Sequence, residues 1–146
     1  MADLDLARRA VACPGWAWRP GMLTTSGLRI VTVLHAPTHG LLYLVARVEA
    51  AGGERTDAGL PGRAWWTKEK LEGGPWLPDL DDAATKGAVL GLVRAAWGDP
   101  GIGTAQRGDG GWRTTTGAAG PGLLLTTGPT EAAALVAALE AAGRRT

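Results

Sequence analysis

The segment from residue 82 to residue 97 constrains the fold most, because both of its ends carry helix signals. Asp81 is placed to cap the first turn, and Asp82 suits the positive end of the helix dipole. Gly98 and Pro100 follow the last apolar residue, as is typical of a helix C-terminus. The apolar face of this predicted helix consists of Val89, Leu92, Val93, Ala96 and Trp97.

One side of the same helix is smooth. Gly87, Gly91 and Ala95 recur every four residues, which places them in one row along the helix. Each interior glycine costs about 1 kcal/mol relative to alanine, so the row needs a reason to exist. It predicts the close approach of another backbone, either in the same chain or in a second copy.

Two strands are expected before this helix, at residues 28–34 and 41–48. The turn-forming residues 35–40 between them favour a hairpin. Both segments are nearly continuous in apolar character, which predicts a central position in a sheet with helices covering at least one face. Residues 63–68 form a candidate third strand, after a polar, Gly-rich segment at 49–63 that we expect to be an exposed loop.

The chain after the helix is rich in glycine, with ten glycines from Gly98 to Gly128. Gly108 to Gly111 separates residues 104–107 from 112–116, a pattern typical of a β-hairpin. Residues 123–127 are a further candidate strand. A last helix starts near Gly128-Pro129 and ends at Gly143.

A short helix at residues 3–13, capped by Asp3 and stopped by Pro14, begins the chain. The order is therefore helix, strands, helix, strands, helix. This order predicts an α+β fold with a mainly antiparallel β-sheet and about three helices. A length of 146 residues predicts a single domain, 1–146.

The composition excludes several classes of protein. The net charge of +1 gives no general attraction to nucleic acid or to an anionic membrane, so nucleic acid is not the favoured partner. A lone cysteine rules out an intramolecular disulfide. The N-terminal residues lack the pattern of a signal peptide, and no run approaches the roughly 18 apolar residues of a membrane span. We expect a soluble protein of the host cytoplasm with no membrane partner.

Nucleophilic catalysis has little support in the sequence. Ser26 is the single serine and has no nucleophile-elbow motif, and Cys13 directly precedes Pro14 at a helix end. The segment 98–104 is glycine-rich like a phosphate-binding loop, but it follows a helix and lacks the Gly-Lys-Ser/Thr ending. We expect a protein that is not an enzyme.

Metal binding is also weakly supported. His35 and His39 have the spacing of two zinc ligands on a helix, but Pro37 between them makes a helix unfavourable. Asp79, Asp81 and Asp82 are explained by capping of the following helix as well as by a magnesium ion. We therefore expect no metal and no cofactor.

Tryptophan and arginine carry the candidate binding site. The chain has seven tryptophans, one tyrosine and no phenylalanine. Flat tryptophan faces can stack on a base, and arginine forks match phosphate groups. The residues that we select as a ligand- or partner-binding set are Arg63, Trp65, Trp66, Arg107, Trp112 and Arg113, with Trp16, Trp18 and Arg19 behind them. The alternative is that the rings serve packing or a protein interface.

Two blocks of sequence resemble small uncharacterised proteins of bacteriophages and prophages. One block is the G-W-x-W-x-P-G-M pattern at residues 15–22, and the other is the D-L-x-D-x-A-T-x-G helix at 79–87 that ends in R-x-A-W-G at 94–98. The resemblance covers about 33 positions. It implies a phage setting and carries no activity with it.

These observations favour a non-enzymatic accessory protein of phage type that acts by binding. Its most concrete form is an inhibitor or sequestering protein directed at a host defence component. Two alternatives stay open: a sponge for a small, for example cyclic, nucleotide held by tryptophan and arginine, and a virion or assembly component. An exposed tryptophan cluster on a flat surface favours a protein partner, a Trp/Arg-lined cleft favours a nucleotide, and closed symmetric rings of a homo-oligomer favour assembly.

Overall fold

The structure is a computed structural model that describes residues 3–38, 40–47, 63–67, 77–117 and 122–145. The described residues form three helices and two three-stranded antiparallel sheets, which confirms the predicted α+β class. The chain divides into two compact units. One unit is Trp18–Thr85, and the other combines Asp3–Ala17 with Lys86–Thr146.

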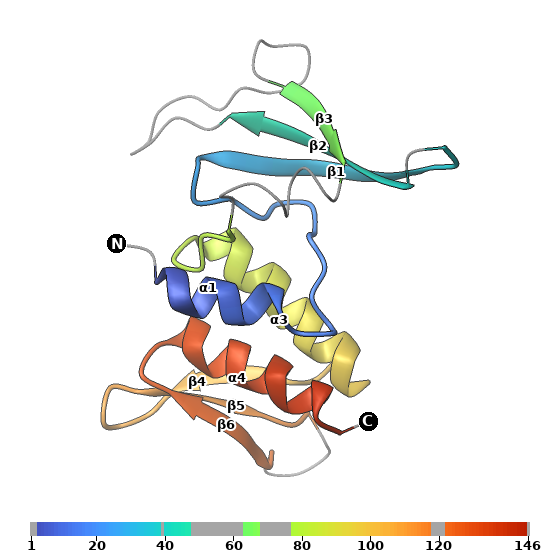
Figure 1. Cartoon of the computed structure of the whole chain (residues 1–146). Helices are drawn as coiled ribbons and strands as arrows, with labels where there is room; N and C mark the ends of the chain where they lie inside the picture. The colour runs from blue at the N-terminus through green and yellow to red at the C-terminus, as the bar shows by residue number, and fades with distance from the viewer. Residues whose placement is uncertain (1–2, 39, 48–62, 68–76, 118–121, 146) are drawn as a thin grey trace. The chain divides into compact units, whose positions relative to one another are not determined.

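The sheet of the Trp18–Thr85 unit contains β1 (Leu28–Ala36), β2 (Gly40–Arg47) and β3 (Arg63–Thr67), in that order and antiparallel throughout (Figure 1). The predicted hairpin is confirmed, with Ala36 paired to Gly40 at its tip. Among the described strands, β2 alone lies between two others, whereas the sequence predicted a central position for both apolar strands. The other side of β1 is bonded to the preceding segment, where the Ile30 N–H donates to the Met22 carbonyl at 2.8 Å and the Gly21 N–H donates to the Ile30 carbonyl at 2.8 Å.

The two faces of this first sheet differ in burial. Leu28, Ile30, Tyr43 and Val45 lie on one face and are almost completely buried. A register shift between Ile30 and Thr32 changes which residues of β1 share a face after that point. The opposite face carries Thr32 and Leu34 from β1, Leu42 and Leu44 from β2, and Trp65 and Thr67 from β3.

Arg29 of β1 pairs with Asp82, the residue that precedes the next helix. The two terminal nitrogens of the Arg29 guanidinium, Nη1 and Nη2, each donate to one carboxylate oxygen of Asp82 at 3.1 Å. The same carboxylate accepts the backbone N–H of Thr85 at 2.9 Å, which is the bond of a helix N-cap. Asp82 therefore caps the helix that begins at Ala83, and not Asp81 as the sequence predicted.

The second sheet contains β4 (Gly103–Gln106), β5 (Trp112–Thr115) and β6 (Leu124–Gly128), again antiparallel and in chain order. Helix α4 (Glu131–Gly143) lies along one face of it (Figure 1). Three threonines join sheet and helix: Thr104 donates to Glu131, Thr114 and Thr126 bond to each other, and Thr126 donates to the Ala134 carbonyl at 2.7 Å.

Helix α4 begins at Glu131, slightly later than the start near Gly128-Pro129 that the sequence predicted. Thr130 accepts the N–H of Ala133 at 3.1 Å and is the N-cap, so Pro129 precedes the helix instead of opening it. The buried residues of α4 are Ala132, Ala134, Leu135, Val136, Ala138, Leu139 and Ala142. Helix α1 (Leu4–Val11), capped by Asp3 as predicted, contacts α4, and Arg9 forms an ion pair with Glu140 at 2.6 Å.

Helix α3 (Ala83–Trp97) places its glycine row where the sequence did not predict it. Gly87 and Gly91 are exposed, and a Cβ added to either would meet no atom of the described residues within 4 Å. Val89, Leu92 and Val93 occupy the buried positions instead. Among the described residues no backbone packs on the row, contrary to the prediction for contact within the chain, because the helix turns its apolar residues inward and the row outward. None of the described helices is long and apolar enough to cross a membrane.

Candidate functional site

The six residues selected from the sequence lie on two different sheets. Arg63, Trp65 and Trp66 belong to β3, in the Trp18–Thr85 unit. Arg107, Trp112 and Arg113 belong to the β4–β5 hairpin, in the other unit. The structure thus groups them as two sets of three, and each set is considered on its own sheet.

The first set exposes one tryptophan on an apolar sheet face. Trp65 pairs with Leu44 across β2 and β3, and Leu42 pairs with Leu34 across β2 and β1. Trp65 is 49% exposed and Leu34 is 50% exposed, while Leu42 and Leu44 are half-buried. We call these four residues the Leu34–Trp65 face.

The other members of this set are placed differently. Trp66 pairs with Tyr43 and shares the buried face of the sheet with it, so the two adjacent tryptophans point to opposite sides. Arg63 pairs with Ala46 at the start of β3, and its side chain lies outside what the structure describes. Among the described side chains of this set, Trp65 alone is exposed.

Two members of the second set, Arg107 and Arg113, lie on the sheet face that α4 leaves uncovered. Arg113 pairs directly with Thr127 on β6 and with Ala105 on β4. A hollow of about 510 Å³ over these strands is lined by Arg107, Arg113, Thr115, Gly122, Leu124 and Thr127. A second hollow of about 660 Å³ shares Arg107 and Thr127 with it and extends to the β4–β5 turn. We call this surface the Arg107–Arg113 face.

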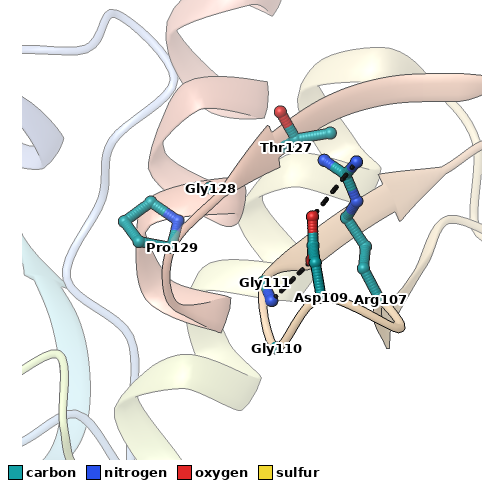
Figure 2. Close-up of a pocket in the computed structure, with 7 residues that line it drawn as sticks. All are labelled: Arg107, Asp109, Gly110, Gly111, Thr127, Gly128 and Pro129. Atoms are coloured by element: carbon teal, nitrogen blue, oxygen red, sulfur yellow. Dashed lines mark hydrogen bonds and ion pairs between the residues drawn. The ribbon is translucent and has the colours of Figure 1, made fainter.

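The tight turn beneath Arg107 is organised by Asp109. Gly110 has a φ of +88°, a backbone conformation that favours glycine. One carboxylate oxygen of Asp109 accepts the N–H of Gly111 at 2.9 Å, and the other lies 3.4 Å from the Arg107 guanidinium. Figure 2 shows Arg107 and Asp109 side by side, with Thr127 on the neighbouring strand. Asp109 thus fixes the turn and balances part of the charge of Arg107.

Trp112 does not join the two arginines on this surface. Because side chains alternate along a strand, Trp112 shares the face of Thr114, which is fully buried beneath α4. The ring of Trp112 is half-buried, whereas Arg113 is exposed. Trp112 and Arg113 therefore do not line one surface, and the Arg107–Arg113 face has no tryptophan of β5 to stack a base.

Trp16 and Trp18 also differ from each other. Trp18 is 2% exposed and Trp16 is half-buried, so neither offers an open ring face. Arg19 between Trp18 and the first sheet is exposed. Trp76 and His39 lie outside the described residues.

The groups considered for catalysis have structural explanations. Cys13 is 7% exposed, its Sγ donates to the Arg9 carbonyl at 3.3 Å, and burial raises its pKa. The Ser26 hydroxyl bonds to that of Thr24 at 2.9 Å. Asp99 accepts the N–H groups of Gly101 and Gly117, so a carboxylate already occupies the glycine-rich loop after α3.

The carboxylate of Asp82, in the Trp18–Thr85 unit, accepts hydrogen bonds from both Arg29 and Thr85. Burial by itself raises its pKa, but the hydrogen bonds from Arg29 and Thr85 and the charge of Arg29 outweigh burial and hold the pKa below its ordinary value. The Asp79 carboxylate accepts the N–H of Asp81 at 3.0 Å, so Asp79 has a structural role in the turn before the helix. Within the part of the chain that the structure describes, no three histidine, cysteine or carboxylate side chains gather as metal ligands would.

Comparison with protein families, with curated proteins and with solved structures finds no match for this chain.

The sequence reasoning missed the leucines of the Leu34–Trp65 face and the threonines beside Arg113. A signal for the leucines was present, since residues 41–45 are apolar without alternation, which requires apolar side chains on both faces of a strand. We assigned that signal to coverage by helices. No sequence signal placed Thr127 beside Arg113, because that neighbourhood depends on the pairing of β5 with β6.

Proposed function

We propose that this protein acts by binding another protein through the Leu34–Trp65 face. The observation that carries the proposal is the exposure of Trp65 and Leu34 on a regular sheet surface. Contiguous apolar surface of this kind marks protein interaction sites more often than isolated exposed leucines do. In the phage setting that the sequence resemblance implies, the partner is a host protein, and the protein acts as its inhibitor or sequestering protein.

The composition of the face suits a protein partner. Tryptophan at the centre of an interface is typical of a binding hot spot, where it fills a pocket of the other protein. The two half-buried leucines on β2 extend the apolar surface beside the ring. Thr32 and Thr67, at register positions on the same face, supply a polar rim.

The geometry favours this function over a nucleotide sponge that stacks a base between tryptophan and arginine. Trp65 lies beside leucines, and the arginines of the second sheet lie on the face opposite Trp112. One exposed tryptophan beside leucines, in place of a tryptophan cluster, suits a protein partner better than it suits a base. The proposal requires no catalytic group.

An affinity experiment with matched leucine variants tests the proposal. Leu34 and Leu41 are comparably exposed, at 50% and 40%, and lie on opposite faces of the same hairpin. The tagged protein is recovered from host cells, and the retained protein is quantified by mass spectrometry. We expect Leu34→Ala to lose most of one specific partner and Leu41→Ala to retain it.

The variant Trp65→Ala measures how much the tryptophan contributes to the binding free energy. Loss of a hot-spot tryptophan costs about 2 kcal/mol of binding free energy, which is roughly a 30-fold weaker affinity. Equal retention by Trp65→Ala, Leu34→Ala and the parent protein would contradict the proposal. The proposal would also be contradicted if sedimentation showed that the parent protein forms a homodimer through this face and the affinity experiment recovered no other partner.

A further inference from the structure

The Arg107–Arg113 face contains cationic charge that the described fold does not neutralise. Arg113 is exposed and has no carboxylate within ion-pair distance among the described residues. Of the described residues that line the two hollows, Asp109 alone is acidic, and it is 3.4 Å from Arg107. Of these two guanidinium groups, that of Arg107 therefore has a carboxylate beside it and that of Arg113 has none among the described residues.

The strand register places hydroxyl donors beside these arginines. Thr127 is directly opposite Arg113 on the neighbouring strand, where Cβ atoms are about 4.5–5.5 Å apart. Thr115 follows two positions later on β5 and therefore shares the face of Arg113. On the other side of Arg113 is Ala105, whose short side chain leaves the guanidinium uncrowded. Arginine forks and hydroxyl groups are the donors that recognise phosphate oxygens.

The hollow is larger than a phosphate ion requires, and it has an apolar end. Its volume of about 510 Å³ falls in the range of small-molecule sites, roughly 300–1,000 Å³. Leu124 lines it and is 60% exposed. A ligand that fits both ends carries a terminal phosphate for the arginines and a flat organic group for the leucine.

We propose that the Arg107–Arg113 face is a binding site for a small phosphomonoester of the nucleoside monophosphate type. Arg107 and Arg113 hold the phosphate oxygens, Thr127 donates to them, and the base covers Leu124. The site lies on the second sheet and does not depend on the protein-binding function proposed for the first. Asp109 competes with the ligand for Arg107 and lowers the affinity of the site.

Isothermal titration calorimetry with adenosine monophosphate tests the site, with inorganic phosphate as the comparison ligand. We expect saturable binding with one ligand per chain, tighter for the nucleotide because only the nucleotide covers Leu124. Arg113→Ala should weaken binding about tenfold or more, since it removes charge-assisted hydrogen bonds. Arg8→Ala is the matched control, because Arg8 is an exposed arginine of the same unit on α1.

The variant Asp109→Asn tests whether Arg107 takes part in binding. The amide oxygen still accepts the Gly111 N–H, so the turn is kept, while the charge that competes for Arg107 is removed. The proposal predicts a several-fold gain of affinity for the nucleotide. A site without Arg107 would show no gain.

Three results would overturn the proposal. The first is unchanged affinity in Arg113→Ala, or in Arg113→Lys if the alanine variant does not fold. The second is equal affinity for phosphate and nucleotide, which removes the ligand class. The third is binding of a single-stranded oligonucleotide that Arg8→Ala weakens as much as Arg113→Ala does, because that pattern indicates diffuse attraction to a polyanion.

Discussion

Replacement of Asp82 by alanine should destabilise the protein more than the same replacement of any other described aspartate or glutamate of the Trp18–Thr85 unit. The variant removes the N-cap acceptor of α3, which costs about 1 kcal/mol. It also breaks the pair with Arg29, whose side chain is only 14% exposed, and hydrogen bonds between charged groups contribute about 1.5–3 kcal/mol. The two losses together amount to about 3 kcal/mol.

Thermal unfolding, followed by circular dichroism, measures this loss. A destabilisation of 1 kcal/mol lowers Tm by about 2–4 °C for a protein of this size, so Asp82→Ala should unfold about 6–12 °C below the parent protein. Asp81→Ala is the matched control, since its carboxylate is exposed and one residue away. We expect the control to stay within about 0.5 kcal/mol of the parent protein.

Asp82→Asn separates the two contributions and gives the pH dependence. Asparagine keeps the cap acceptor but loses the charge that pairs with Arg29. The folded-state pKa of Asp82 is below its ordinary value, so the stabilisation from ionised Asp82 is present above the unfolded pKa of about 3.9 and is lost as pH falls through the folded pKa. The stability difference between the parent protein and Asp82→Asn should shrink over that pH window.

Two results would refute this reasoning. If Asp82→Ala unfolds at the same temperature as Asp81→Ala, the bonds from Arg29 and Thr85 do not stabilise the unit. If the difference between the parent protein and Asp82→Asn stays constant from pH 6 to pH 2, the pair with Arg29 does not hold the carboxylate ionised.

Two further predictions concern α3 and the buried thiol. Gly91→Ala should stabilise the protein by about 0.5–1 kcal/mol, measured by urea unfolding, because Gly91 lies in an exposed helix interior with open space at its Cβ; a destabilised variant would show that the glycine row is covered, as by a second copy. Cys13 should react with iodoacetamide at pH 8 far more slowly in the native protein than in urea, because burial raises its pKa and limits access; equal rates would contradict its burial.

Elements whose signals are local were predictable from the sequence. Helix α3 ends before Gly98, which has a φ of +65°, and both β-hairpins follow the turn residues that the sequence contains. Helix starts were less exact, because neighbouring residues compete as caps. Asp81 and Asp82 are both good caps by type, and only the position of Arg29 on β1 decides between them.

The candidate sites were predictable in residue type but not in grouping. Trp65 and Arg113 were identified because their side chains suit binding, and both are exposed. The sequence does not contain the pairing of β5 with β6, which brings Thr127 to Arg113. It also gave no means of assigning Trp112 to the side of α4, because a strand's alternation indicates which residues share a face but not which face a helix covers.

Site-specific photo-cross-linking tests the Leu34–Trp65 face most directly. A photoreactive amino acid is placed at position 34 in one variant and at position 35 in another, both expressed in host cells. These neighbours on β1 point to opposite faces of the sheet, as their pairing with Leu42 and Leu41 requires. The account predicts a covalent adduct with one host protein from position 34 and none from position 35. Adducts of equal yield from both positions, or from position 35 alone, would contradict it.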